Sequence, residues 1–230
     1  MEADEPESDD PSRDHGGALM NERISAYLDS LEQALPGELE SLEEEALSEF
    51  IPILRKEEQS FLRTILLLEK PERILEVGTG TGFSALFMRH FIPENAKIVT
   101  IESYAPRIKK AKAHFDAYGK GQITLLSGDA EEILPTLSEP FDLIFLDAAK
   151  GQYPVLLPEL LRLLRVGGVL LADNVLQQGM ILDVREVVKQ RDRSTHDRMR
   201  EFLYKLTHDP SLSTAILPMG DGMSFTVKES

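Results

Sequence analysis

From Arg73 onward the chain alternates short apolar runs with longer amphipathic stretches. The apolar runs predict strands at about 73–77, 97–101, 123–126, 142–146 and 168–172. The amphipathic stretches predict helices at about 83–91, 105–118, 130–137, 153–165 and 195–207. Runs that are apolar at successive positions suit strands that are covered on both faces. The alternation therefore predicts an α/β fold with a mostly parallel, doubly wound sheet.

Both ends of the chain depart from this alternation. Two β-rich runs, 214–218 and 223–228, flank Gly220-Asp221-Gly222, which predicts an antiparallel hairpin and brings the sheet to seven strands. Helical spacing before the first strand predicts helices at about 21–35, 38–50 and 56–68. Residues 1–19, rich in Asp, Glu, Pro, Ser and Gly, are expected to be a disordered acidic tail, and residues 20–230 a single domain.

Composition limits what such a domain binds. The formal net charge of −15 disfavours a general nucleic-acid binder, because phosphate contacts supply most non-specific affinity. Cysteine is absent, so hard oxygen ligands must hold any metal. No apolar run approaches the roughly 18–20 residues that span a bilayer, and the acidic N-terminus is unlike a secretory signal. We therefore expect a cytoplasmic protein that does not enter a membrane.

Three glycines follow the first strand and open a helix. Gly78, Gly80 and Gly82 let the backbone turn tightly and approach a ligand without a Cβ in the way. Such a loop also suits a dinucleotide or a plain tight turn. The Gly-x-Gly-x-Gly spacing and the preceding Glu76 favour S-adenosylmethionine, because a carboxylate suits an aminoacyl ammonium better than a pyrophosphate. Ser84, on the first turn of the helix, is placed to donate to the cofactor carboxylate.

Two further carboxylates follow the next strands. Glu102 lies just past the second strand, where it can accept both ribose hydroxyl protons; the alternative is an exposed surface glutamate. Asp129 follows the third strand and can accept from the adenine amino group. It can also cap the helix that begins at Ala130, and both roles are compatible.

Polar side chains also end the fourth and fifth strands. Asp147 follows a wholly apolar strand, and Asp173 and Asn174 follow the next one. In an adjacent parallel pair these side chains converge at the sheet edge. Two carboxylates and an amide oxygen suit Mg²⁺, with Mn²⁺ or Ca²⁺ as alternatives, and a cation relieves the repulsion between the carboxylates. The competing interpretation is a set of helix caps and loop hydrogen bonds.

Lys150 follows the first of these carboxylates by one short turn. A divalent metal lowers the pKa of a bound hydroxyl, and Lys150 is placed to take its proton or to steady the oxyanion. A surface lysine at a helix start is the alternative, although a cation is disfavoured there by the helix dipole. We therefore name Asp147 and Lys150 as candidate catalytic residues.

The motifs at Leu75–Gly82, Asp147–Lys150 and Asp173-Asn174 resemble those of the cation-dependent O-methyltransferases, which include catechol and caffeoyl-CoA methyltransferases. The resemblance runs from about Met20 to Lys228. It implies a Rossmann-like class I methyltransferase fold, whose parallel sheet ends in an antiparallel hairpin. It also implies that the metal ligands are Asp147, Asp173 and Asn174, and that the cofactor pocket is lined by Leu54, Ser84, Glu102, Asp129, Ala130 and Asp147. Leu54 stands where the family pattern has methionine.

Three segments, Asp147–Tyr153, Asp173–Leu176 and Leu217–Gly222, look more narrowly like the bacterial tRNA 5-hydroxyuridine methyltransferases. This resemblance implies methylation of 5-hydroxyuridine to 5-methoxyuridine at the tRNA wobble position, and a homodimer. The tRNA anticodon loop would then be the partner. A basic segment between 185 and 205 offers a face for it, although a solvated helix with internal salt bridges explains the same charges.

The same sequence leaves other functions open. A small-molecule catechol-type O-methyltransferase fits the same motifs, because catechol and 5-hydroxyuridine both present two vicinal oxygens. A nicotinamide dehydrogenase is disfavoured by the glycine spacing, the terminal hairpin and the paired Asp-Asn. A non-catalytic module that binds the cofactor or tRNA is disfavoured by the intact ligand set.

Overall fold

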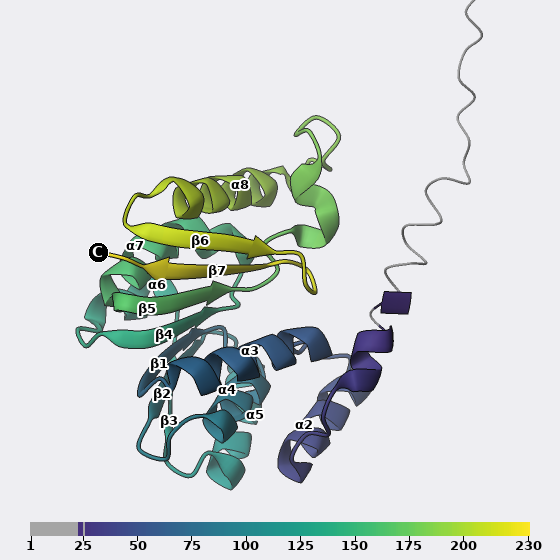
Figure 1. The fold of residues 1–230 in the computed structure, drawn as a ribbon, viewed down its shortest axis with the longest axis vertical. Coiled ribbons are helices and arrows are strands. Elements are labelled where there is room, and N and C mark those ends of the chain that lie inside the picture. Colours follow the sequence, from purple (N-terminus) through teal and green to yellow (C-terminus); the bar gives the residue numbers. More distant parts are fainter. Residues whose placement is uncertain (1–22, 25) are drawn as a thin grey trace, which may run out of the picture. The chain divides into compact units, whose positions relative to one another are not determined.

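The computed structural model describes residues 23–24 and 26–230. At its centre lies a seven-stranded sheet with the strand order β3-β2-β1-β4-β5-β7-β6 (Figure 1). The strands are β1 (Arg73–Val77), β2 (Lys97–Glu102), β3 (Ile123–Ser127), β4 (Phe141–Leu146), β5 (Leu164–Ala172), β6 (Leu212–Leu217) and β7 (Met223–Lys228). The first five are parallel, whereas β7 is antiparallel to β5 and to β6. This confirms the predicted α/β class and the terminal hairpin.

Helices cover both faces of the sheet (Figure 1). The helices are α2 (Gly37–Ser48), α3 (Lys56–Glu69), α4 (Phe83–Phe91), α5 (Ala105–Tyr118), α6 (Ala130–Ile133), α7 (Tyr153–Leu163) and α8 (Arg193–His208), with 3₁₀ turns η1 (Leu134–Thr136), η2 (Lys150–Gln152) and η3 (Gln177–Leu182). On one face the core is built from α6, α7 and α8, and on the other from α2, α3 and α4. Successive β4 residues alternate between these cores: Ile144 and Leu146 join the first, and Leu143 and Phe145 the second. The double burial explains why the strand is apolar throughout.

Two elements differ from the sequence prediction for local reasons. The predicted helix 130–137 is α-helical only to Ile133 and then tightens into η1, because Pro135 has no N–H for the next helical hydrogen bond. Strand β5 begins at Leu164 rather than at 168. Leu164 pairs with Phe141, and the register then shifts before Val169 pairs with Leu143. Gly167, at φ +73°, lies in this irregular part of the strand. The strand therefore extends past a bulge, which the apolar pattern of the sequence does not predict.

The N-terminal part of the chain forms a separate unit that ends at Ala34. Its residues 23–24 and 26–31 are helical, whereas 32–35 are not, so the predicted 21–35 helix ends earlier than expected. The predicted acidic tail, 1–19, lies outside the described residues. Within the described ranges, no helix has both the length and the apolar character needed to cross a membrane.

Candidate functional site

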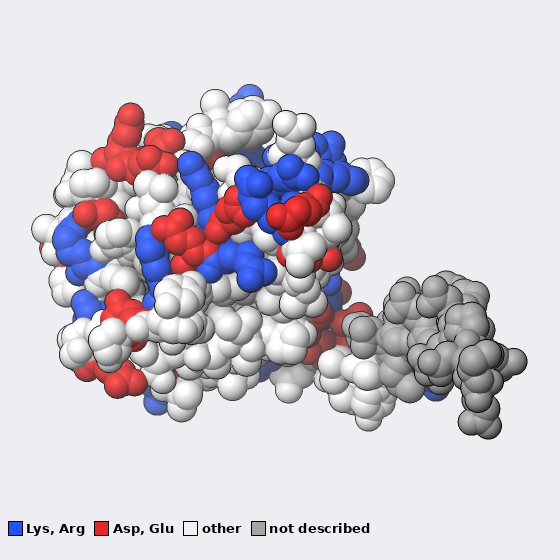
Figure 2. Space-filling view, turned by 90° about the horizontal axis from the view of Figure 1, so that it is seen from above, with Lys and Arg blue, Asp and Glu red and all other residues white. Residues whose placement is uncertain are grey.

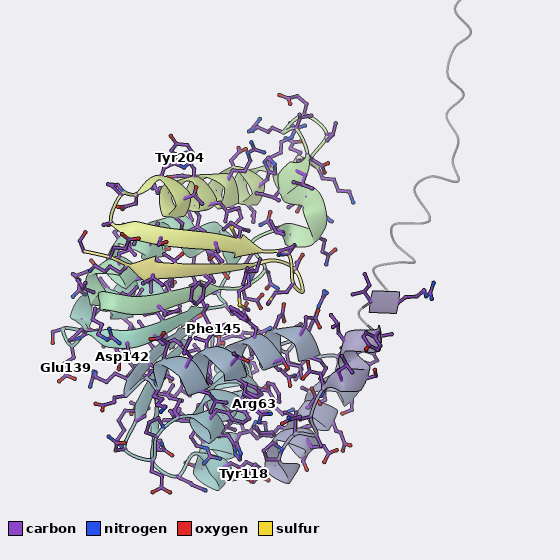
Figure 3. The ribbon with its side chains drawn as sticks, viewed as in Figure 1. Arg63, Tyr118, Glu139, Asp142, Phe145 and Tyr204 are labelled. Atoms are coloured by element: carbon purple, nitrogen blue, oxygen red, sulfur yellow. The ribbon has the colours of Figure 1, made fainter. Side chains whose placement is uncertain are left out.

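The carboxyl ends of β1, β2, β3 and β4 border a cavity of about 470 Å³. Figure 3 labels Asp142 near the start of β4 and Phe145 near its end, which marks the direction in which the strands run toward this edge. Most of the predicted cofactor residues line the cavity, namely Leu54, Gly78, Gly80, Ser84, Glu102, Asp129, Ala130 and Asp147. The structure therefore brings residues that follow four strands, and Leu54 from the segment before α3, to one place.

Gly78 sets how closely the first loop approaches β4. Its φ is +102°, and a Cβ there would lie 2.6 Å from the carbonyl carbon of Asp147 and closer still to the oxygen. The Gly78 N–H donates to the Ile101 carbonyl at 3.0 Å, so the loop is fixed between β2 and β4. Only glycine combines this backbone conformation with this contact.

Glu102 is held by backbone amides at the end of β2. Its Oε2 accepts from the Gly80 N–H at 3.0 Å, and its Oε1 accepts from the N–H groups of Ser103 and Tyr104 at 3.0 and 2.9 Å. The carboxylate is only 7% exposed, yet it lines the cavity. This fixed orientation fits the predicted contact with ribose hydroxyls, since each carboxylate oxygen can accept more than one hydrogen bond.

Asp129 caps the helix that follows it. Its Oδ1 accepts from the Glu131 backbone N–H at 2.9 Å, which satisfies one of the open amides at the start of α6. The same residue lines the cavity beside Ala130, so the cap does not exclude the predicted contact with adenine.

Glu76 lies beneath the cavity rather than in its wall. The residue is fully buried, and its carboxylate accepts from the hydroxyls of Ser84 and Thr100, each at 2.5 Å. Ser84 is therefore oriented by Glu76 while it lines the cavity. Burial raises the pKa of Glu76 from 4.5 to about 7, although both hydroxyl hydrogen bonds oppose the shift. A direct contact between Glu76 and a cofactor stays a prediction.

The raised pKa of Glu76 predicts how stability depends on pH. Between about pH 4.5 and pH 7 the folded chain keeps a proton that the unfolded chain has lost, so the free energy of unfolding falls as the pH rises. Glu76→Gln removes this titrating group. As the pH rises from 4 to 8, we expect the free energy of unfolding of Glu76→Gln to increase relative to that of the wild type by up to roughly 3 kcal/mol. Urea unfolding of both proteins at several pH values measures the difference.

Other groups that titrate in this range cancel in the comparison, because both proteins contain them. Glu94→Gln removes one carboxylate from the exposed surface and serves as the matched control. The prediction would be contradicted if the free energy of unfolding changed with pH in the same way for the wild type and for Glu76→Gln.

A second cavity, of about 430 Å³, adjoins the first and shares Asp147 and Asn174 with it. Asp173 and Lys150 also line this second cavity. The convergence follows from the register, because Leu146 of β4 is paired with Ala172 of β5 and the polar residues come directly after this pair. The four residues predicted for metal binding and chemistry therefore meet at one site.

Acidic side chains outnumber basic ones around the second cavity. Asp173 is 4% exposed, and burial, followed by the charges of Glu58 and Asp147, raises its pKa to about 7. Lys150 compensates in part, since its Nζ donates to Asp147 Oδ1 at 2.8 Å. A divalent cation would relieve the remaining repulsion.

The oxygen donors suit such a cation. No group of three or more His, Cys, Asp or Glu residues within 23–24 and 26–230 is arranged to hold a metal. The predicted set has two carboxylates and one amide oxygen, and Mg²⁺ commonly takes one or two carboxylates together with water. The residues present therefore fit a magnesium ion, and the metal itself stays a proposal.

Tyr153 joins the two strand ends and has no predicted role. Its buried hydroxyl lies 3.2 Å from the Leu146 carbonyl and 3.0 Å from the Asp173 carbonyl, and it accepts from Lys150 Nζ at 3.0 Å. It thus fixes Lys150 relative to the ends of β4 and β5. A tyrosine three residues after Lys150 was the available signal, but spacing alone gives no partner across strands.

The loop after β5 has an unusual backbone. Asn174, Gln177 and Gln178 all have positive φ values, of 54°, 50° and 53°. Non-glycine residues rarely adopt this conformation, and it persists where the surroundings impose it. The Gln178 N–H donates to the Asp221 carboxylate, which ties the loop to the hairpin turn. All four residues line the second cavity, so the strained segment forms part of its wall.

The basic segment is largely occupied with internal contacts. Three arginines donate to backbone carbonyls: Arg193 to Val188 and Glu186, Arg198 to Gly151, and Arg200 to Ile181. Arg185 pairs with Asp197 at 2.8 Å. Figure 2, which views the molecule from the α8 side, shows basic and acidic side chains intermixed. Several basic side chains of this segment therefore stabilise neighbouring backbone by hydrogen bonds.

Residues 27–229 match the family model described as O-methyltransferase. The chain belongs to this family. The membership confirms the resemblance to O-methyltransferases, and the cation dependence stays a prediction. The narrower likeness to tRNA 5-hydroxyuridine methyltransferases stays a prediction.

Individual relatives are similar to the chain over different lengths. A catechol O-methyltransferase of Niastella koreensis is 37% identical over 128 residues, which cover 54% of this chain and 58% of that protein. A caffeoyl-CoA O-methyltransferase of Populus kitakamiensis is 29% identical over 231 residues, covering 90% of this chain and 94% of that protein. The SAH-bound methyltransferase PaMTH1 of Podospora anserina has a TM-score of 0.82 and 27% identity, with full coverage of both chains.

Proposed function

We propose that this chain transfers the methyl group of S-adenosylmethionine to one of two neighbouring oxygens on an acceptor held by a divalent metal, and that the acceptor is 5-hydroxyuridine at the tRNA wobble position. The observation that carries the proposal is the pair of adjoining cavities that share Asp147 and Asn174. One cavity has the features of a nucleoside site and the other is lined by hard oxygen donors. A methyl donor and an oxygen acceptor can thus meet at the shared wall.

The chain's residues divide the work between the cavities. Glu102 accepts from the ribose, Leu54 packs on the cofactor, and Ser84 with the loop amides binds its carboxylate. Asp147, Asp173 and Asn174 hold Mg²⁺, which when bound lowers the pKa of the acceptor hydroxyl and orients it. Lys150 Nζ lies 2.8 Å from Asp147 Oδ1, beside the proposed metal site. As an ammonium it steadies the charge on the acceptor oxygen, and as a neutral amine it takes the hydroxyl proton.

The proposed acceptor satisfies the chemistry of the second cavity. The 5-hydroxyl and 4-carbonyl oxygens of 5-hydroxyuridine are vicinal and can chelate one ion in a five-membered ring. A base in the anticodon loop is largely single-stranded and can be turned outward at modest cost. A homodimer, which the family resemblance implies, and a cytoplasmic location, which the composition predicts, complete the proposal.

A small catechol is the second candidate acceptor, and two observations favour it. The similar Niastella koreensis protein is named for catechol. In addition, Arg193, Arg198 and Arg200 are engaged with backbone carbonyls, which leaves fewer cations for phosphate. Nucleoside mass spectrometry of tRNA from cells lacking the gene tests the first candidate. Accumulated 5-hydroxyuridine would support it, whereas unchanged 5-methoxyuridine would leave the catechol reading.

Variants of the exposed cations in the basic segment distinguish the two candidate acceptors in vitro. We expect the double variant Lys189→Glu/Arg191→Glu to lower kcat/KM for tRNA by about tenfold or more, since reversed charges repel phosphate. Methylation of free catechol should be unchanged, because a neutral acceptor makes no phosphate contact.

Lys109→Glu/Lys112→Glu on α5 makes the same change in net charge elsewhere and is the matched control. Equal losses on tRNA for both double variants would indicate general repulsion instead of a binding face.

A further inference from the structure

The buried hydroxyl of Tyr153 lies where three polar groups meet. Its oxygen is 3.2 Å from the Leu146 carbonyl and 3.0 Å from the Asp173 carbonyl, and Lys150 Nζ donates to it at 3.0 Å. A phenol has a single proton, so it donates to one carbonyl at a time and its oxygen is left to accept from Lys150. The ends of β4 and β5 are therefore both joined to Lys150 through one hydroxyl.

Packing from α8 fixes the ring that carries this hydroxyl. The buried ring of Phe202 meets the Tyr153 ring edge-on, with centroids 5.2 Å apart and an angle of 68° between the planes. Arg198, one turn earlier on α8, donates to the Gly151 carbonyl at 2.7 Å, within the η2 turn that begins at Lys150. The hydroxyl and the turn beside it are thus held by the same helix.

Lys150 needs a second anchor besides its carboxylate partner. Its Nζ donates to Asp147 Oδ1 at 2.8 Å, but the Asp147 side chain is 41% exposed and is not enclosed by its surroundings. A lysine amine on a flexible four-carbon stem takes many positions around such a partner. Tyr153 supplies an acceptor that is fully buried. Together the two contacts give the amine one defined place in the wall of the second cavity.

Tyr153 itself lines neither cavity. Its hydroxyl is therefore outside the spaces proposed for the cofactor and for the acceptor. Any effect of this hydroxyl on methyl transfer must pass through the groups that it contacts, and among these only Lys150 carries a side chain with a proposed role in the transfer.

We infer that Tyr153 is a positioning residue for methyl transfer, its buried hydroxyl holding Lys150 Nζ beside Asp147 where the amine meets the acceptor oxygen. The inference rests on the proposed function. Small displacements of a group that acts on the reacting atoms cost much of the rate, even when binding is unaffected. Tyr153 therefore contributes to kcat and leaves the affinity for the cofactor unchanged.

Tyr153→Phe removes the hydroxyl and keeps the ring that packs on Phe202. We expect kcat to fall by about tenfold or more, because a hydrogen bond to a charged group is lost. The KM for S-adenosylmethionine should be unchanged. The acceptor in this assay is whichever of catechol and tRNA carrying 5-hydroxyuridine the wild type methylates, with Mg²⁺ present. Tyr118→Phe, at the end of α5 and outside both cavities, is the matched control.

A double-mutant cycle shows whether the hydroxyl acts through the amine. Lys150→Met removes the amine and keeps an unbranched side chain. In this background Tyr153→Phe should change kcat by less than about twofold, since the group that the hydroxyl positions is already absent. A general loss of packing would lower kcat equally in both backgrounds, so the cycle distinguishes positioning from a structural role.

Chemical labelling tests the position of Lys150 without any methyl transfer. Acetic anhydride acetylates lysine amines, and peptide mass spectrometry follows each site in the full chain. We expect Lys150 to be acetylated about threefold or more faster in Tyr153→Phe than in the wild type, because one of its two hydrogen bonds is lost. Lys109, exposed on α5, should react at the same rate in both proteins and serves as the internal control.

The outcomes separate this inference from the proposed function. Equal effects of Tyr153→Phe in the two backgrounds, or unchanged acetylation of Lys150, would overturn the role of Tyr153 and leave the methyl transfer standing. If the wild type with S-adenosylmethionine and Mg²⁺ methylates neither acceptor, the proposed function falls. The labelling then still decides whether Tyr153 holds Lys150 in place.

Discussion

Asp173→Ala should abolish methyl transfer while leaving the binding of S-adenosylmethionine largely intact. Asp173 lines only the second cavity, whereas most residues predicted to bind the cofactor line the first. If Asp173 binds the proposed metal, its loss removes one of two charged ligands, and a bound metal contributes several kcal/mol to stabilising the transition state. We therefore expect kcat to fall by at least about 1,000-fold. Single-turnover assays with a radiolabelled methyl group measure this loss.

Calorimetry supplies the second half of the test. Titration with S-adenosylmethionine should give an affinity close to the wild-type value for Asp173→Ala, and titration with Mn²⁺ should show that metal binding is lost. Asp147→Ala is the contrasting variant, because Asp147 lines both cavities and its loss should weaken both ligands. Asp116→Ala, on the exposed surface of α5, controls for removal of an aspartate.

Several results would contradict this division of roles. Full activity of Asp173→Ala after exhaustive chelation would remove the metal from the proposal. Loss of cofactor affinity with normal metal binding would instead place Asp173 at the cofactor. Thermal melting of each variant separates both results from a general loss of folding.

The fold was predictable because the strongest signals are local. Strand β1 and helices α4 and α5 have the predicted bounds, since Gly82 and Pro106 mark the helix starts and Ile74, Leu75 and Val77 make β1 mostly apolar. Features that depend on pairing between strands were not predictable. The early start of β5 rests on the pairing of Leu164 with Phe141, which has no counterpart in the local pattern.

In the candidate site too, residues with a local sequence signal were predicted and residues placed by tertiary packing were not. Asp147, Asp173 and Asn174 were found from sequence because each comes directly after an apolar strand and parallel strands end at one edge. Glu58 was not found, because it lies on α3, before the first strand, and only tertiary packing brings it to the cavity. Glu76 lies deeper than a motif indicates, since sequence does not tell whether a strand-end carboxylate faces the cavity or the core.

Gly78→Ala should cost more stability than any other single methyl addition in the glycine-rich loop. The new Cβ would meet the Asp147 carbonyl, which is backbone and is itself fixed by the hydrogen bond from the Asp147 N–H to the Val77 carbonyl at 2.8 Å. The φ of +102° adds strain for an L-residue. Strain and overlap with fixed backbone together predict a loss of roughly 4 kcal/mol in the free energy of unfolding.

Gly80→Ala is the matched control two residues away. Its φ is +55°, but a Cβ there meets no atom within 4 Å, so only the backbone strain of about 1–2 kcal/mol remains. Urea unfolding of the two variants measures the difference that is due to the contact with Asp147. Equal losses would mean that β4 moves away at little cost, and then the two cavities would not share a rigid wall at Asp147. A large loss confined to Gly78→Ala would instead show that the glycine-rich loop and the strand end at Asp147 are built as one unit.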